Sequence, residues 1–256
     1  MGEELGSKMA QRSFDHVLQY CGPAARRAVP LAVALLNVSS PDMLAMDVLS
    51  RLSHDADGDV AMGACLGLGL MGAGTNNARL ANMLRQLSSY FYKEPSCLFL
   101  TRVSQGLVHL GKGLLTLSPH HSDRLLLSGQ GVAGLLAVLV ASLQMKATLA
   151  GRHHPLLYCL APAMHPRMFM PVSPDGAIIQ TPARVGEAVD VVAQAGRPKA
   201  ITGFQTHTTP VLLAVGERAE LATEKYLPRS SVLEGLVICV ENPDYVEEVH
   251  EKHAHG

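Results

Sequence analysis

The spacing of apolar residues along the first half of the chain predicts a series of short helices. Between about Phe14 and Ser118, aliphatic residues recur every three or four positions in segments that turn-forming residues separate. This spacing is the period of an amphipathic α-helix. The predicted helices span residues 24–38, 43–52, 78–92 and 95–110, and a further one starts at Val60 with Asp59 as its N-cap.

The helix that starts at Val60 runs into a stretch of unusual composition. Residues 63–77 are crowded with glycine and alanine, yet their larger side chains keep helical spacing at Met62, Leu66, Leu70 and Met71. A helix of small residues allows the backbones of its neighbours to approach closely on both sides. We therefore interpret the stretch as an inner helix of a packed array.

Three segments of the first half align as an internal repeat. The segments begin at Ala32, Gly67 and Gly106, so they are 35 and then 39 residues apart. Each contains an inner helix of small and aliphatic residues and is accompanied by an outer amphipathic helix. Two helices per unit at this period are typical of an α-solenoid. The glycines predicted to serve this packing are Gly67, Gly69, Gly72, Gly74, Gly106, Gly111 and Gly113.

The second half of the chain has the pattern of short strands. Strand-length apolar segments occur at residues 185–192, 200–207, 211–215, 219–223 and 236–240, with Gly or Pro between them. Ser173–Gly176 is a turn sequence. The predicted fold is thus mainly α, with helical repeats of an α-solenoid or toroid at 1–150. A β-rich module follows at 151–243, and the tail 244–256 is expected to be disordered.

A long uncharged segment raises the question of a membrane span. No charged residue lies between Arg124 and Lys146, but Ser128, Gln130, Ser142 and Gln144 interrupt the apolar run. A spanning helix needs about 20 predominantly apolar residues. We interpret the segment as a fully buried central helix and expect no membrane association.

Charge and cysteine content narrow the class of protein. The 21 Lys and Arg residues balance 22 Asp and Glu residues, which leaves a net charge of −1 and no basic surface for nucleic acid. The five cysteines are scattered without metal-ligand spacing. They are expected to be reduced thiols in an apolar core, in a cytosolic or nuclear protein.

Two glycine-rich stretches have the form of nucleotide-binding motifs. Gly67, Gly69 and Gly72 match the dinucleotide fingerprint G-x-G-x-x-G, but no strand precedes them and no acidic residue follows at ribose distance. Gly106–Gly113 resembles a P-loop, yet Gly113 stands where a Ser or Thr must bind magnesium. A nucleotide-binding enzyme that uses either stretch remains an alternative to the scaffold.

The polar clusters do not have the spacing of a catalytic or metal site. Residues 55–59 begin like a calcium loop but lack the required Gly and Glu, so an acidic turn is expected, with a basic partner as its candidate contact. The adjacent pairs His120–His121 and His153–His154, and Ser122 with Asp123, are expected in solvated loops. We predict no catalytic, cofactor-binding or metal-binding residue.

Several segments of the chain resemble a known family. In the first half they are Ser53–Asp57, Gly74–Leu80, Met83–Leu87, Gln105–Leu107 and His109–Gly113. These look like the proteasome/cyclosome repeats of the large non-ATPase subunits in the base of the 26S proteasome. Segments of the second half resemble the smaller of the two toroidal scaffolds in that family: Val185–Val192, Gly196, Ile201–Ala214 and Gly216–Thr223.

The resemblance covers Met1 to about Tyr245 and implies a function. Members of the family are several times longer, so the chain is expected to be a C-terminal portion. The resemblance implies a non-catalytic scaffold of the 19S regulatory particle, in cytoplasm and nucleus, that contacts ATPase subunits and other regulatory-particle subunits. Ubiquitin-like shuttle proteins would bind through the full-length protein, and no ubiquitin-binding residue is assigned here. An unrelated α-solenoid adaptor is a second alternative.

Overall fold

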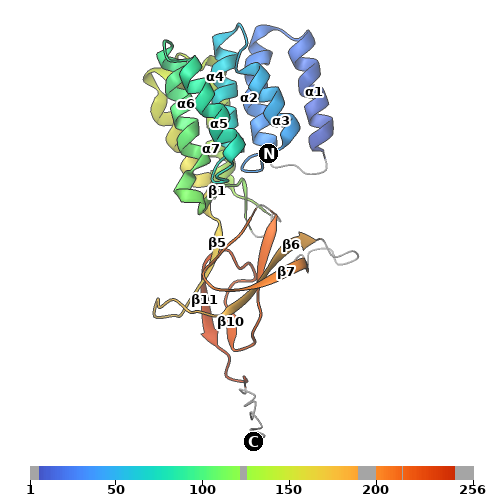
Figure 1. Ribbon diagram of the computed structural model, residues 1–256, viewed down its shortest axis with the longest axis vertical. Helices are drawn as coiled ribbons and strands as arrows, with labels where there is room; N and C mark the ends of the chain where they lie inside the picture. The colour runs from blue at the N-terminus through green and yellow to red at the C-terminus, as the bar shows by residue number, and fades with distance from the viewer. Residues whose placement is uncertain (1–5, 122–125, 190–199, 215, 246–256) are drawn as a thin grey trace, which may run out of the picture. The chain divides into compact units, whose positions relative to one another are not determined.

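The computed structural model forms two compact units, a helical unit from Met1 to Arg167 and a β unit from Met168 to Gly256 (Figure 1). It describes residues 6–121, 126–189, 200–214 and 216–245. The predicted order of helical repeats followed by a β-rich module is confirmed. The helical unit extends beyond residue 150, because the turns that follow pack on its core.

Six helices form the first part of the helical unit. They are α1 (Ser7–Tyr20), α2 (Pro23–Leu36), α3 (Met43–Leu52), α4 (Gly58–Met71), α5 (Ala78–Tyr90) and α6 (Pro95–Val108). The helices expected at 24–38, 43–52, 78–92 and 95–110 are confirmed to within two residues. The predicted N-cap of α4 was wrong: the helix begins at Gly58, and the side chain of Asp57 accepts a hydrogen bond from the amide of Asp59.

The helices are arranged as three outer–inner pairs. The inner helices α2, α4 and α6 lie side by side, with α4 in the middle, while α1, α3 and α5 each pack against the inner helix that follows them (Figure 1). Every residue of α4 from Val60 to Met71 is buried. The outer helix α5, by contrast, buries only Leu80, Leu84 and Leu87. The pattern of small residues therefore marks the helix that has neighbours on both sides.

The segment after residue 128 also packs against the inner helices α2, α4 and α6. It contains α7 (Gly129–Ala141) and the short 3₁₀ and π turns η2 (Ser142–Gln144), η3 (Thr148–Arg152) and η4 (His154–Ala163). Its side chains join the same core as the inner helices, including Leu135, Val138, Met145 and Leu149. The turn η1 (Leu110–Gly113) and the short pairs β1 (Leu115–Leu117) with β4 (Met164–Pro166) and β2 (His120–His121) with β3 (Leu126–Leu127) complete the unit.

Helix α7 is not the fully buried central helix that its composition predicted. Gly131, Gly134, Leu135, Val138 and Ala141 are buried, but Leu136 is 44% exposed and Val140 is 65% exposed. The uncharged sequence therefore packs on one side and leaves an apolar face open. None of the helices in the described part of the chain has both the length and the hydrophobicity that crossing a bilayer requires.

The β unit consists of two sheets that share a small core. One has the strand order β10-β11-β5-β8 and the other β7-β6-β9. Strand β11 runs parallel to β5, and the remaining pairs are antiparallel. The core is formed by Phe169, Ala183, Val185, Leu213, Ala219, Leu233, Val237 and Cys239.

The predicted strands are found with shifted ends. The strands are β5 (Met168–Val172), β6 (Pro182–Val189), β7 (Ala200–Thr208), β8 (Val211–Leu212), β9 (Glu217–Leu221), β10 (Tyr226–Pro228) and β11 (Gly235–Glu241). The turn expected at 173–176 is confirmed, with Gly176 at φ 84° and its amide bonded to the Ser173 carbonyl at 2.9 Å. The strand β10 was not predicted, because three residues that end in proline carry too short a pattern. Predicted residues 190–192 and 215 and most of the tail lie outside the described residues.

The glycines of α4 lie where neighbouring backbones come close. A Cβ at Gly67 would lie 3.2 Å from both the Ala34 Cβ and the Pro30 carbonyl oxygen of α2. On the other side, a Cβ at Gly69 would lie 2.6 Å from Ser104 Cα of α6. There the Ser104 Oγ lies 2.7 Å from the Cys65 carbonyl oxygen of α4 and 2.9 Å from that of Leu100. Glycine thus permits the approach on both flanks.

The turns after the inner helices repeat one backbone geometry. The aligned residues Ser39, Gly74 and Gly113 all have positive φ, at 51°, 69° and 87°. The Ser39 amide donates to the Leu70 carbonyl at the end of α4, and the Gly74 amide donates to the Leu107 carbonyl at the end of α6. The first two turns are therefore each bonded to a carbonyl in the last turn of the next inner helix.

Gly106 differs from the other repeat glycines. It lies on the exposed face of α6, and a Cβ there would have no atom within 4 Å. The alignment placed it with Gly67, but packing does not require glycine at this position.

Replacing Gly69 with alanine tests the close approach of α4 and α6. We expect Gly69→Ala to lower the free energy of unfolding by about 1–3 kcal/mol, because the new Cβ forces the Ser104 backbone away. Chemical denaturation would measure the change. The matched control is Gly106→Ala, expected to raise stability by up to about 0.5–1 kcal/mol because alanine favours an exposed helix. Equal effects of the two substitutions would contradict the packing role of Gly69.

Candidate functional site

The dinucleotide fingerprint lies in the wrong part of a helix to bind phosphate. Gly67 and Gly69 are in the buried C-terminal half of α4, and the Gly72 amide donates to the Leu68 carbonyl. Phosphate binds where free amide groups point out of a helix N-terminus. The amides of this stretch are already bonded within the helix, so the geometry leaves no phosphate cradle.

The P-loop-like stretch likewise lies at a helix C-terminus. Gly106 is in the last turn of α6, and Gly111 and Lys112 follow it in η1 with positive φ. The His109 ring nitrogen Nδ1 lies 2.8 Å from Asn76 Oδ1, and the side-chain Nδ2 of Asn76 donates to the Lys112 carbonyl at 3.3 Å. The negative end of the helix dipole lies here, which disfavours a phosphate. The stretch joins the turns of two successive repeats.

The acidic turn between α3 and α4 is paired with two arginines near the start of α2. Arg26 lies 3.4 Å from Asp55 Oδ2, and Arg27 lies 2.9 Å from Asp57 Oδ2 and 3.5 Å from Asp59 Oδ2. The other oxygen of each carboxylate accepts a backbone hydrogen bond, from the amides of Asp57, Asp59 and Lys146 in turn. The basic partner of the turn is thus in the same chain, and its oxygens are not free to bind calcium.

The environment of Asp57 favours its ionised form. Partial burial acts to raise its pKa, but the hydrogen bond from Arg27 and the amides of Asp59 and Val60 together hold the pKa below its ordinary value. In the sequence, the signal for this network was the adjacent pair Arg26 and Arg27 together with three aspartates at alternate positions, 55, 57 and 59. Only the fold shows that the two segments meet.

The remaining thiols and imidazoles do not form a site in the described part of the chain. Burial raises the pKa of Cys65 to about 11 and that of Cys97 to about 12, so both remain protonated thiols. The expectation that all five cysteines lie in the core was wrong for Cys21, which is exposed. His153 and His154 are exposed, Ser122 and Asp123 lie outside the described residues, and no metal-binding cluster occurs among the residues described.

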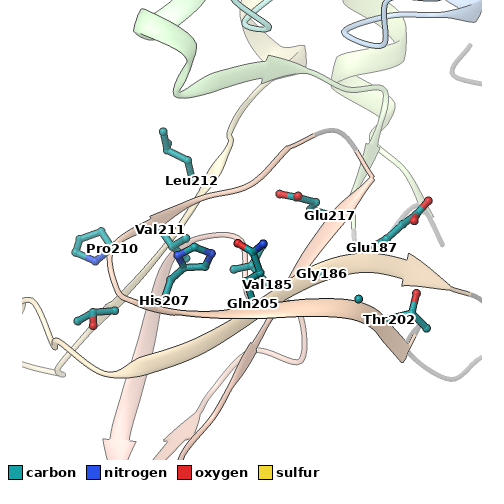
Figure 2. Close-up of a pocket in the computed structure, with 12 residues that line it drawn as sticks. Val185, Gly186, Glu187, Thr202, Gln205, His207, Pro210, Val211, Leu212 and Glu217 are labelled. Atoms are coloured by element: carbon teal, nitrogen blue, oxygen red, sulfur yellow. The ribbon is translucent and has the colours of Figure 1, made fainter.

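The β unit contains a cleft that the sequence did not predict. Its volume is about 660 Å³, and it lies between β7 and β8 (Figure 2). The side chains along it come from four strands and from the connection between β7 and β8, and they are Val185, Glu187, Thr202, Gln205, His207, Thr208, Pro210, Val211, Leu212 and Glu217. No sequence motif indicates this cleft, because its walls are set by strand register.

A second surface of interest is the open face of α7. Leu136, Val140, Leu143 and Leu156 line an apolar groove of about 660 Å³ there. Exposed apolar surfaces of this kind are typical of protein–protein interfaces.

Two family models match the chain. Residues 63–97 match the proteasome/cyclosome repeat, which covers most of α4, all of α5 and the start of α6. Residues 192–245 match the model described as 26S proteasome non-ATPase regulatory subunit RPN1 C-terminal, which covers much of the β unit.

Curated relatives match almost the entire chain. The 26S proteasome non-ATPase regulatory subunit 2 homolog B of Arabidopsis thaliana is 62% identical over 248 residues, which are 97% of this chain. The 26S proteasome non-ATPase regulatory subunit 2 of Dictyostelium discoideum is 53% identical over 244 residues, and the regulatory subunit rpn1 of Schizosaccharomyces pombe is 51% identical over 247. The chain spans 27–28% of the length of these relatives.

The acidic turn predicts a pH-dependent contribution of Asp57 to stability. We expect Asp57→Asn to lower the free energy of unfolding at pH 7 by about 1 kcal/mol, because the amide can still cap α4 but loses its ion pair. Since the folded pKa of Asp57 lies below its unfolded value, its contribution is present above the unfolded pKa and disappears as pH falls through the folded pKa. Denaturation between pH 7 and pH 3 should therefore show the two proteins converging.

The control for this prediction is Asp47→Asn. Asp47 pairs with Arg79 at 3.1 Å, but both side chains are largely exposed, so we expect a change of only a few tenths of a kcal/mol. A difference between the wild type and Asp57→Asn that does not vary with pH would contradict the ion-pair explanation.

Proposed function

Because the chain belongs to the family of RPN1-type non-ATPase regulatory subunits of the 26S proteasome, we propose that it is the C-terminal part of a non-catalytic scaffold in the base of the 19S regulatory particle. The observation that carries the proposal is 62% identity over 97% of the chain. Its mechanism is binding through stacked-helix and sheet surfaces, without bond chemistry.

The structure of the helical unit supports this function. Gly67, Gly69, Gly72 and Gly74 act as packing residues that let inner helices and their turns approach, and Gly111 and Gly113 allow the turn after α6. A rigid array of this kind presents an extended surface to several partners at once. The apolar groove along α7 is a further surface with the apolar character of an interface.

The partners follow from membership of the regulatory particle. We propose that the chain contacts proteasomal ATPase subunits and other subunits of the particle, in cytoplasm and nucleus, and so supports ubiquitin-dependent protein degradation. Ubiquitin-like shuttle proteins would bind the full-length protein, and we assign them no residue of this chain. A nucleotide-binding enzyme is not supported, because both glycine-rich stretches lie toward helix C-termini.

Affinity purification tests the scaffold function. When the chain is expressed with a tag in cells that contain 26S proteasomes, we expect proteasomal ATPase subunits to be recovered with it, as identified by mass spectrometry. The Gly69→Ala variant, which loosens the helical stack, should recover less of them, whereas Gly106→Ala should match the wild type. Absence of ATPase subunits from the wild-type sample would contradict the proposal and favour an unrelated solenoid adaptor.

A thermal shift measurement tests the enzymatic alternative. With millimolar ATP and Mg²⁺, or with NAD, we expect no change in melting temperature, because no free phosphate cradle exists at either glycine-rich stretch. A ligand present at 100 times its Kd would stabilise the folded chain by about 2.7 kcal/mol. A clear rise in melting temperature with either nucleotide would therefore restore the enzymatic interpretation.

A further inference from the structure

The core of the β unit opens to the surface along strand β7. Ala183 and Val185 of β6 belong to this core, and the antiparallel register places them opposite His207 and Gln205 of β7. Side chains at opposite positions share one face of a sheet, so His207 and Gln205 are on the core face. Both are nevertheless exposed, and β7 is the end strand of its sheet. The core face therefore has no cover beyond β7 among the described residues.

The cleft of the β unit lies at this opening. Pro210 and Val211 line it on the side of β8, and Val185 lines it from β6 (Figure 2). Gln205 and His207 line it from β7 itself. This part of the cleft therefore combines apolar side chains of its neighbours with the core-face positions of an end strand.

The outer edge of β7 lacks two of the usual protections of an edge strand. Among the described residues it pairs with no strand, and Ala200–Thr208 contains neither a charged residue nor a proline. A β-bulge interrupts the strand, because Gly186 of β6 stands against both Gly203 and Phe204 of β7. From Gln205 to Thr208 the register is regular. This part of the edge is therefore the template for a further strand.

A strand added at this edge would lie directly beside β7, with no other strand between them. Its alternate side chains would be on the core face, next to Gln205 and His207, and would enter the cleft near Pro210 and Val211. The apolar residues there favour aliphatic side chains. The row of backbone donors and acceptors along the edge matches another extended backbone rather than a small ligand.

We propose that the edge of β7 from Gln205 to Thr208 binds an extended segment of a partner protein by β-augmentation, with aliphatic side chains of the segment at alternate positions in the cleft beside Pro210 and Val211. Main-chain hydrogen bonds supply the affinity, and the cleft selects the side chains. The inference uses the geometry of the β unit alone and goes beyond the scaffold function.

A labelled peptide tests the proposal with the full chain. The probe is an acetylated, fluorescein-labelled peptide in which two valines alternate with three threonines between terminal lysines, and binding is measured by fluorescence anisotropy. We expect saturable binding. A peptide with serine in place of both valines should bind at least about tenfold more weakly, which corresponds to about 1.4 kcal/mol, because it leaves the cleft unfilled. Equal affinity of the two peptides would overturn the role of the cleft.

Backbone methylation tests the strand pairing. Two further peptides carry N-methyl groups, one on its valines and the other on its threonines. Successive amides of a strand point to opposite edges, so one of these peptides cannot donate to β7 and should lose its affinity. If both bind as well as the unmethylated peptide, or if N-acetylvaline methylamide competes fully, the ligand is a small apolar group and the β-augmentation is wrong.

Two substitutions on β7 test which face of the strand is involved. Gln205→Glu puts a charge on the core face, where the aliphatic side chain is to be buried, and should weaken binding at least about tenfold. The matched control is Thr206→Glu, which adds the same charge at the next position, on the opposite face and across from Arg184. It should bind like the wild type. Equal loss of affinity in the two variants would mean that the charge acts diffusely, which contradicts the proposal.

Both substituted positions are exposed, so the variants should fold. We expect each to keep the wild-type melting temperature to within a few degrees, as followed by circular dichroism, so that lost binding is not lost folding. Wild-type affinity in a folded Gln205→Glu variant would overturn the proposal. None of these results depends on whether the chain co-purifies with proteasomal ATPase subunits.

Discussion

The close packing of α4 between α2 and α6 is the constraint on which the helical unit depends. A helix with neighbours on both sides must bury all of its surface, and Val60–Met71 does so without a charged residue. Side chains of ordinary size would separate the backbones, so the sequence places glycine where Ser104 on one side and Pro30 and Ala34 on the other come nearest. Close packing of the helices therefore explains the glycines that also match a nucleotide-binding motif.

Charge at the edge of the array complements this apolar packing. The acidic turn before α4 bonds to two arginines near the start of α2 and to the Lys146 amide through Asp59. Three segments distant in the sequence are thus joined where α4 begins, and the carboxylates also favour the positive end of its dipole. The turns at the other end, Ser39 and Gly74, bond to the following inner helices. Both ends of the stack are therefore tied by polar contacts, while its middle is held by van der Waals packing.

The β unit follows different physics, because its stability rests on strand register. Its inward-facing side chains fill one small core around Phe169 and Val237. The outer edge of β7, by contrast, pairs with no other strand among the described residues. Glu187 and Glu217 are directly opposite each other in the β6–β9 register.

Hydrophobic periodicity in the sequence was sufficient to place helices α2 to α6, the main strands and the inner–outer alternation, because each depends on neighbours within a few residues. The resemblance of short segments then identified the family. The sequence could not show that α7 is buried on one side only, because an apolar composition does not reveal how many other elements pack against a helix. Nor could it show that Arg26 and Arg27 meet the acidic turn, or that Gly106 lacks a close neighbour. The cleft was decided by tertiary structure alone, because it requires the register that sets Glu187 opposite Glu217 and the path that brings β7 beside β8.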